Sequence, residues 1–248
     1  MRKYLLLLLN LSSMVCFGQF NLVYDFTRPL GEQGKHISTA HGLTLGFESR
    51  LKQSPFLWGA ELGLNIYGLK TITQDLPSHN GYVTKTDVHY TTSFTTYAAS
   101  LKLQPPTAKH VKPYGLIRTG ILHYHSNMTI DDPDDPLGCK PLEKKVLLKD
   151  FTWLASAGLG TNLDWKLFNP TSSSMIQLNF AVLYTMGGPA DYLKMSKTSD
   201  GVDPKGKLYY VKFENVATGE VHDHAIGKIY NSVTSLLTIR AGIRLILD

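Results

Sequence analysis

The segment LHYHSN, residues 122–127, groups two histidines with a serine, residue types that could support acid–base or nucleophilic chemistry. A histidine activates a serine when both side chains lie within hydrogen-bond reach. Neighbours in a strand point to opposite faces, so His125 and Ser126 would be separated, and Tyr124 stands two residues before the serine, where a same-face histidine would be needed. His123 and His125 share a face, but no third metal ligand is evident beside them. We therefore expect neither catalysis nor metal binding here.

An acidic stretch follows in residues 131–135, with aspartates at Asp131, Asp132, Asp134 and Asp135. Carboxylate oxygens suit calcium, but the glycine and closing glutamate of an EF-hand loop are absent. We expect a solvated loop and no cofactor. The formal net charge of the whole chain is +5 and its basic residues are scattered, which argues against a nucleic-acid partner.

Residues 1–18 have the layout of a secretory signal peptide. Arg2 and Lys3 form the basic start, Leu5–Leu9 begins the apolar run, and compact residues lead to Gly18. Cleavage after Gly18 would leave one domain, residues 19–248, whose single cysteine, Cys139, cannot form an internal disulfide. Beyond this leader no run reaches the roughly eighteen apolar residues of a membrane helix. If the remaining chain crosses a membrane, it must do so with strands.

Alternation of apolar and polar residues predicts eight strands, separated by clusters of Gly, Pro, Asn, Asp and Ser. They are Phe20–Thr27, His41–Leu51, Leu57–Thr71, Val88–Leu103, Pro113–Met128, Asp150–Trp165, Met175–Met186 and Leu236–Asp248.

The connections between these strands alternate strictly between long and short. Residues 28–40, 72–87, 129–149 and 187–235 are long, whereas residues 52–56, 104–112 and 166–174 are short. Outer-membrane barrels sort their loops in this way, with an even number of strands and both termini on the side of the short turns. The pattern predicts a single eight-stranded antiparallel up-and-down transmembrane β-barrel.

The faces of the strands differ in chemistry. In the last strand Ile239 and Ile243 share an apolar face, while Arg240 and Arg244 lie on the other. Arginine in hydrocarbon costs about 2–4 kcal/mol, so we expect the polar, glycine-rich faces to point inward. Inward charges must find opposite partners because an unpaired buried ion is strongly destabilising. The expected lumen ion-pair cluster consists of Glu48, Glu61, Arg118, Asp164, Arg240 and Arg244.

The predicted fourth strand changes phase. Val88, Tyr90 and Phe94 alternate in one phase and Tyr97, Ala99, Leu101 and Leu103 in the other, so we expect a bulge or a phase error near Thr95. In the long segment 187–235, residues Lys207–Val216 are strand-like, and we expect a hairpin there that projects above the membrane.

The signal-like leader, the glycine-rich strands WGAELGLNIYG, PYGLIRTG and WLASAGLG, and the closing IRAGIRLIL resemble the small porin-like and OmpA-barrel-like outer-membrane proteins of Bacteroidetes. The resemblance covers the chain after its leader and implies the outer membrane of a Gram-negative bacterium, with both termini periplasmic and lipid around the barrel. It implies little about activity.

We therefore expect a non-enzymatic barrel with a plugged, charged lumen and a structural or protein-interaction role. It could serve as an accessory subunit of an envelope complex, with any protein partner at residues 187–235. The alternatives are a lipid-modifying outer-membrane enzyme and a narrow channel for small solutes.

Overall fold

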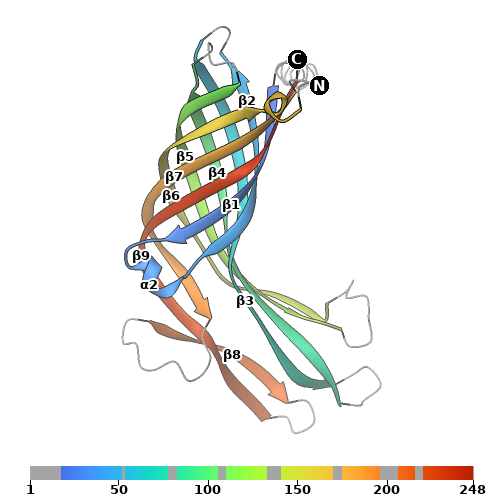
Figure 1. The fold of residues 1–248 in the computed structure, drawn as a ribbon. Coiled ribbons are helices and arrows are strands. Elements are labelled where there is room, and N and C mark those ends of the chain that lie inside the picture. Colours follow the sequence, from blue (N-terminus) through green and yellow to red (C-terminus); the bar gives the residue numbers. More distant parts are fainter. Residues whose placement is uncertain are drawn as a thin grey trace, which may run out of the picture.

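A closed antiparallel β-barrel forms the body of the molecule (Figure 1). The computed structural model describes residues 18–51, 54–77, 83–105, 110–132, 141–169, 175–195, 206–215 and 220–247. Its strands are β1 (Gly18–Pro29), β2 (Ala40–Arg50), β3 (Phe56–Pro77), β4 (Val83–Leu103), β5 (Val111–Ile130), β6 (Glu143–Asp164), β7 (Ile176–Met195), β8 (Lys207–Asn215) and β9 (Glu220–Ile246).

Eight of these strands, β1–β7 and β9, make the barrel. They follow the order β1-β2-β3-β4-β5-β6-β7-β9, and β1 pairs with β9 to close the sheet. Gln19 faces Ile246 in that closing pair, so both ends of the described chain lie at one end of the barrel. The predicted all-β, eight-stranded antiparallel barrel is confirmed. The expected leader, residues 1–18, falls almost wholly outside the described residues.

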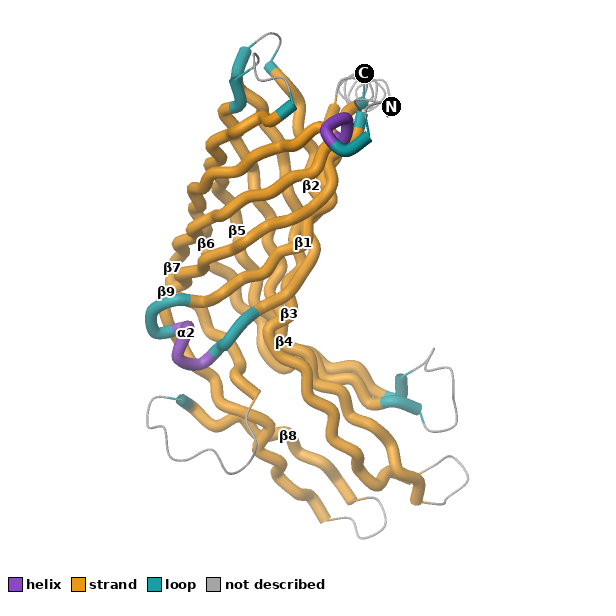
Figure 2. The backbone as a smooth tube through the Cα atoms, viewed as in Figure 1, coloured by secondary structure: helices purple, strands orange, loops and turns teal. Residues whose placement is uncertain are grey.

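The strands are longer than predicted at the end of the barrel away from the termini. Much of the predicted loops 72–87, 129–149 and 187–235 continues as paired strand (Figure 2). Charged runs such as EKKVLLKD at Glu143–Asp150 hide the apolar alternation, but the backbone ladder that begins in the barrel continues through them. The predicted hairpin is confirmed, with β8 paired to the start of β9.

Beyond the barrel the strands divide into two sheets, which we call the extension. The first sheet comprises residues 67–77, 83–93, 124–130 and 143–153, and the second comprises residues 188–195, 207–215 and 220–233. They separate because β6 and β7 pair only as far as Leu154 and Gly187.

The sequence Gly187-Gly188-Pro189 explains this division of the sheet. A Cβ at Gly187 would lie 2.5 Å from the Trp153 carbonyl oxygen, so only glycine allows this close approach of the two backbones where their pairing ends. Pro189 has no N–H to donate, and it lies just beyond Gly187, where the pairing of β7 with β6 ends.

The two sheets of the extension pack against each other through their own hydrophobic cluster. Val88, Tyr90 and Met128 of the first sheet meet Leu193 and Val211 of the second. Burial raises the pKa of the Tyr90 phenol to about 12, so this hydroxyl is neutral at physiological pH. The extension is therefore a packed β-sandwich with a core of its own.

Two short helical segments lie in connections between strands. Helix α2 (Gln33–His36) occupies the β1–β2 connection beside the extension, and η1 (Trp165–Leu167) lies after β6 near the other end (Figure 1). Neither of these described helices is long and apolar enough to cross a membrane.

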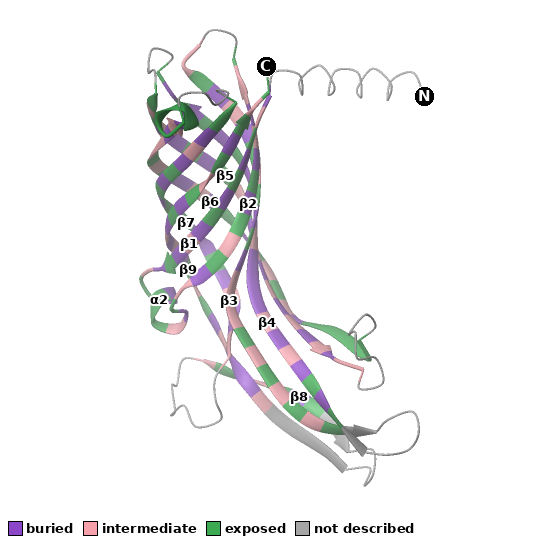
Figure 3. Ribbon diagram, turned by 45° about the vertical axis from the view of Figure 1, so that its right-hand side comes forward, coloured by how far each residue is buried: buried purple, intermediate pink, exposed green. Residues whose placement is uncertain are grey.

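Large apolar side chains cover the outside of the barrel. Cross-strand neighbours form a nearly continuous ring in which each residue is 47–59% exposed. Figure 3 shows the alternation of buried and exposed residues along these strands. The ring runs through Ile243, Leu22, Leu45, Leu62, Tyr97, Ile121 and Trp153.

The irregularity expected near Thr95 lies elsewhere. Strand β4 keeps one phase from Val88 to Lys102, and the register shift is at Tyr67 on the facing strand β3. Val88, Tyr90 and Phe94 point inward together with the polar residues that follow them, because this end of the interior is apolar. The prediction of a phase change in β4 was wrong.

Candidate functional site: the two halves of the barrel interior

One ion network lies in the half of the interior nearer the termini. Glu61 accepts from Arg118 Nη1 at 2.9 Å and from Arg240 Nη1 at 2.8 Å. Arg240 Nε lies 3.0 Å from Asp25 Oδ1, and the Thr44 hydroxyl donates to the other Asp25 oxygen at 2.5 Å. The Glu61 side chain is only 7% exposed, so the network is removed from solvent.

A second ion network centres on Glu48. Its two carboxylate oxygens meet Lys102 Nζ and Arg244 Nη2, the latter at 2.9 Å. Arg244 also donates to Gln104 Oε1 at 3.0 Å and to Gln19. Arg244 is 1% exposed, and every strand that contributes to this network does so with an inward-facing position.

The predicted cluster therefore divides into separate groups. Glu61, Arg118 and Arg240 belong to the first network, and Glu48 and Arg244 belong to the second. Asp164 joins neither, because it lies at the rim with Lys112 Nζ at 2.9 Å. The orientation expected for the last strand is what the structure shows for Arg240 and Arg244, which are 5% and 1% exposed.

Amides and one tyrosine connect the second network to the wall. Asn179 donates to Tyr114 Oη at 2.7 Å and to Asn162 at 2.6 Å, and Asn162 donates to Gln104 at 3.1 Å. Lys102 Nζ lies 4.3 Å from the centre of the Tyr114 ring, within cation–π range. These contacts supply the additional hydrogen bonds that a buried ion pair needs if it is to be tolerated.

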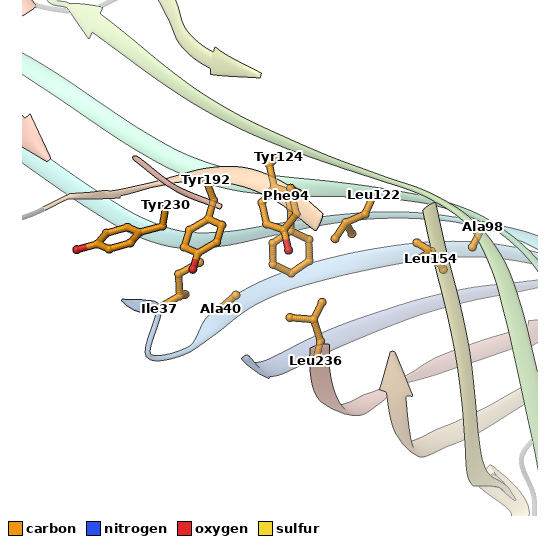
Figure 4. Packing of buried hydrophobic residues seen from close by; sticks show 11 residues of the cluster. Ile37, Ala40, Phe94, Ala98, Leu122, Tyr124, Leu154, Tyr192, Tyr230 and Leu236 are labelled. Atoms are coloured by element: carbon orange, nitrogen blue, oxygen red, sulfur yellow. The ribbon is translucent and has the colours of Figure 1, made fainter. Parts of the chain in front are cut away.

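The half of the interior nearer the extension is aromatic. Phe94, Tyr124, Tyr192 and Tyr230 form a row with Leu122 and Leu154 at its inner end (Figure 4). Ring centroids of successive pairs lie 5.7–6.2 Å apart, a normal separation for interacting aromatic rings.

The β1–β2 connection closes this aromatic half. Gln33 Nε2 donates to Tyr124 Oη at 2.6 Å, and the His36 ring stacks on Tyr230 with centroids 3.7 Å apart. Ile37 is buried in the same cluster. At the junction of the two halves, beside Arg118 and Leu122, a cavity of about 20 Å³ remains. Such a volume holds about one water molecule.

The histidine segment lies mainly on the outer surface. His123 stacks on Phe151 with centroids 4.0 Å apart, and His125 Nε2 lies 2.8 Å from Ser93 Oγ across the strands. Ser126 points inward and is buried. His125 thus meets a serine on a neighbouring strand that the local sequence pattern could not reveal.

Other candidate ligands are dispersed. Asp131 Oδ2 lies 2.9 Å from His89 Nε2, while Asp134, Asp135 and Cys139 lie outside the described residues. Within the part of the chain that the structure describes, no three His, Cys, Asp or Glu side chains gather as a metal site would require.

Sequence reasoning missed Asp25 and Gln104. Asp25 could have been found, because Phe20, Leu22 and Tyr24 alternate with an inward phase that contains it. Gln104 follows the end of β4 and carries no periodic signal, and only the folded barrel brings it to Arg244.

Several solved structures are similar to this chain, and three of them are outer-membrane or surface proteins. Neisserial surface protein A has a TM-score of 0.40 and 10% identity, covering 92% of this chain and 96% of its own. Ail, the attachment invasion locus protein of Yersinia pestis, has a TM-score of 0.37 and 12% sequence identity, and the match covers 92% of this chain and 97% of Ail. The outer membrane protease OmpT from Escherichia coli has a TM-score of 0.37 and 9% sequence identity, and the match covers 93% of this chain and 94% of OmpT. These values are too low to assign a function. No protein-family model matches the chain, and no curated protein sequence matches it significantly.

Proposed function

We propose that this chain is a non-enzymatic integral outer-membrane β-barrel, closed to solutes, that carries a packed β-sandwich outside the membrane for binding a partner protein. The observation that supports it best is that apolar side chains face outward and charged side chains face inward, the reverse of the arrangement in a water-soluble protein. Ile239 and Ile243 are 51% and 47% exposed, whereas Arg240 and Arg244 between them are buried. Apolar side chains facing out and ions facing in suit a barrel surrounded by lipid.

Closure of the barrel backbone supports the same location. In hydrocarbon every backbone N–H and C=O must be paired within the protein, and a closed barrel achieves this because it has no edge. The pairing of β1 with β9 runs from Gln19–Ile246 to Pro29–Leu236 and removes the edge along the whole wall.

The filled lumen argues against transport. Eight strands enclose a space that side chains can fill. Here the two ion networks occupy one half and the aromatic row occupies the other. The junction between the halves retains a cavity of only about 20 Å³.

The extension is the proposed place for a protein partner, because it has a core of its own and its second sheet lies entirely within residues 187–235. In an outer-membrane barrel the short turns and the termini face the periplasm, so the extension would face the cell exterior.

Two cysteine variants test location and orientation. In a Cys139→Ser background, Lys145→Cys places a thiol on the exposed part of the extension, and Ser54→Cys places one at a short turn. Labelling of intact cells with a membrane-impermeant maleimide should modify the first and spare the second. The reverse pattern would overturn the orientation, and recovery in the soluble fraction would overturn the membrane assignment.

Planar bilayers test the closed lumen. The purified protein should give no discrete conductance steps. If steps do occur, the variant Gly63→Leu, which adds a side chain to the interior of the barrel, separates two explanations. Conductance steps that persist in this variant would show that the ions do not pass through the lumen. Steps that this variant abolishes would establish a channel and overturn the proposal.

The contact between Ser93 and His125 gives a second candidate, an acyl-transfer enzyme acting on lipid at the outer surface. A serine 2.8 Å from a histidine nitrogen is the geometry of a nucleophile and its base. It ranks second because Ser93 is 2% exposed and because His125 Nδ1 has no hydrogen-bond partner among the described residues to orient the ring. An unchanged lipid A acylation pattern in Ser93→Ala cells would eliminate it.

A further inference from the structure

Strand β8 has a free edge. Among the described strands it pairs with β9 alone, at the end of the sheet order β7-β9-β8. The backbone groups of Lys207–Lys212 that point away from β9 therefore have no strand partner. An edge of this kind is a template to which an extended chain can add.

Packing holds this edge in place. Tyr209 and Val211 belong to the hydrophobic cluster between the two sheets, and Tyr209 Oη donates to the Leu147 carbonyl at 3.0 Å. The opposite face of the strand carries Leu208 and Tyr210, which are 45% and 51% exposed. A partner strand would thus meet a preorganised backbone and apolar side chains on one face, which lowers the entropic cost of binding.

The corresponding edge of β6 is less suitable. It carries an extra residue at Leu147, between the pairs Ser126–Leu148 and Asn127–Val146, and a bulge of this kind disturbs the ladder. The Asp150 carboxylate also reaches across to the Asp191 N–H at 2.7 Å and occupies part of that edge. In β8 the extra residue lies on the partner β9 instead, so β8 itself is regular.

Charge defines the kind of partner. Lys207 and Lys212 are both exposed, one at each end of the free segment. Opposite charges across a strand pair are favourable and like charges are unfavourable. The edge therefore favours a segment with an acidic residue opposite each terminal lysine.

We propose that β8 binds an extended acidic segment of a partner protein by taking it up as an additional antiparallel strand. This inference rests on the proposed function and identifies the part of the extension that carries it. A second copy of this chain fits less well, because the antiparallel register that pairs all of Lys207–Lys212 with itself sets Lys207 opposite Lys212.

A designed peptide tests the proposal on the full-length protein in lipid nanodiscs. The probe contains Glu-Thr-Val-Thr-Val-Glu between Gly-Ser flanks, and its counterpart has lysine at both glutamate positions. The glutamate peptide should bind about tenfold more tightly, as expected from two cross-strand charge contacts. Amide exchange should slow across residues 207–212. Equal binding of both peptides, or binding without this protection, would overturn the proposal.

Charge exchange provides a reciprocal test that loss of folding cannot mimic. Lys207→Glu/Lys212→Glu should reverse the preference, so that the lysine peptide binds more tightly. The matched control, Lys144→Glu/Lys145→Glu, makes the same change at exposed lysines on the bulged edge of β6 and should leave the preference unchanged. An equal effect of the control would assign binding to overall charge rather than to β8.

Two further outcomes are informative. A probe with proline in place of both valines should not bind, because it cannot supply the ladder. Dimerisation of the protein that strengthens in the single variant Lys207→Glu, which would set opposite charges across the self-paired register, would show that β8 binds a second copy and would overturn the proposal. If no peptide binds while the labelling and conductance results hold, the β8 proposal fails and the proposed membrane anchor stands.

Discussion

The two halves of the barrel interior are closed in different ways. Near the termini, Glu61 and Glu48 hold arginine and lysine side chains from distant strands in buried ion networks. Near the extension, Phe94, Tyr124 and Tyr192 fill the same kind of space by packing. Removing one charged group from a buried ion network leaves its partner uncompensated and is strongly destabilising. An apolar cluster instead loses stability in proportion to the volume that is removed.

The largest effect should come from the ionic half. Glu61→Gln keeps the size of the side chain but leaves Arg118 without a carboxylate partner among its described contacts and takes one from Arg240. We expect a loss of about 3–5 kcal/mol of unfolding free energy. Urea unfolding in lipid vesicles, followed by tryptophan fluorescence, measures it.

A double variant sharpens this result. Glu61→Gln/Arg118→Met should recover part of the loss, because the unpaired cation has been removed as well. Asp164→Asn is the matched control at the rim, where Lys112 reaches solvent, and it should cost less. If Glu61→Gln proved as mild as this control, the ion network would contribute little to closure.

An intermediate effect is expected from the aromatic half. Leu122 is 1% exposed, and Leu122→Ala would open a cavity beside the row of aromatic rings. We expect a loss of about 2–4 kcal/mol. The same unfolding assay measures it, with Ile121→Ala on the exposed outer face as control. Equal losses in both variants would contradict the assignment of inner and outer faces.

The smallest effect should follow from removing one hydroxyl. Tyr124→Phe keeps the ring in the aromatic row but removes the contacts to Gln33 at 2.6 Å and to Thr234 at 3.4 Å. We expect a loss of about 1 kcal/mol.

Amide exchange of residues 33–36 offers a second reading of the same variant. It should accelerate in Tyr124→Phe, because Gln33 anchors helix α2 to the interior. Unchanged exchange would show that the stacking of His36 on Tyr230 holds the connection without this hydrogen bond.

The extension shows where sequence reasoning was insufficient. Strand β8 was predictable from its alternation, but the lengthening of β3–β7 was not. Their outer segments mix charged residues with apolar ones, as in EKKVLLKD, so the alternation is weak, and they pair because ladders that begin in the barrel continue into them. The packing of the two sheets through Val88 and Leu193 joins residues that are far apart in the chain, and local periodicity cannot predict such contacts.

The sequence by itself determined the eight-stranded closure and the face on which each side chain of the wall lies. Strand alternation placed Arg240 and Arg244 on one face, and the order of long and short connections, which predicted a membrane barrel, assigned that face to the interior. Only the tertiary structure decided which carboxylate each arginine meets. Arg240 contacts Glu61, which lies 179 residues away in the sequence, and barrel closure together with the strand register brings the two side chains together. The aromatic half, the split at Gly187–Pro189 and the free edge of β8 were decided in the same way, because each depends on where strands stop pairing.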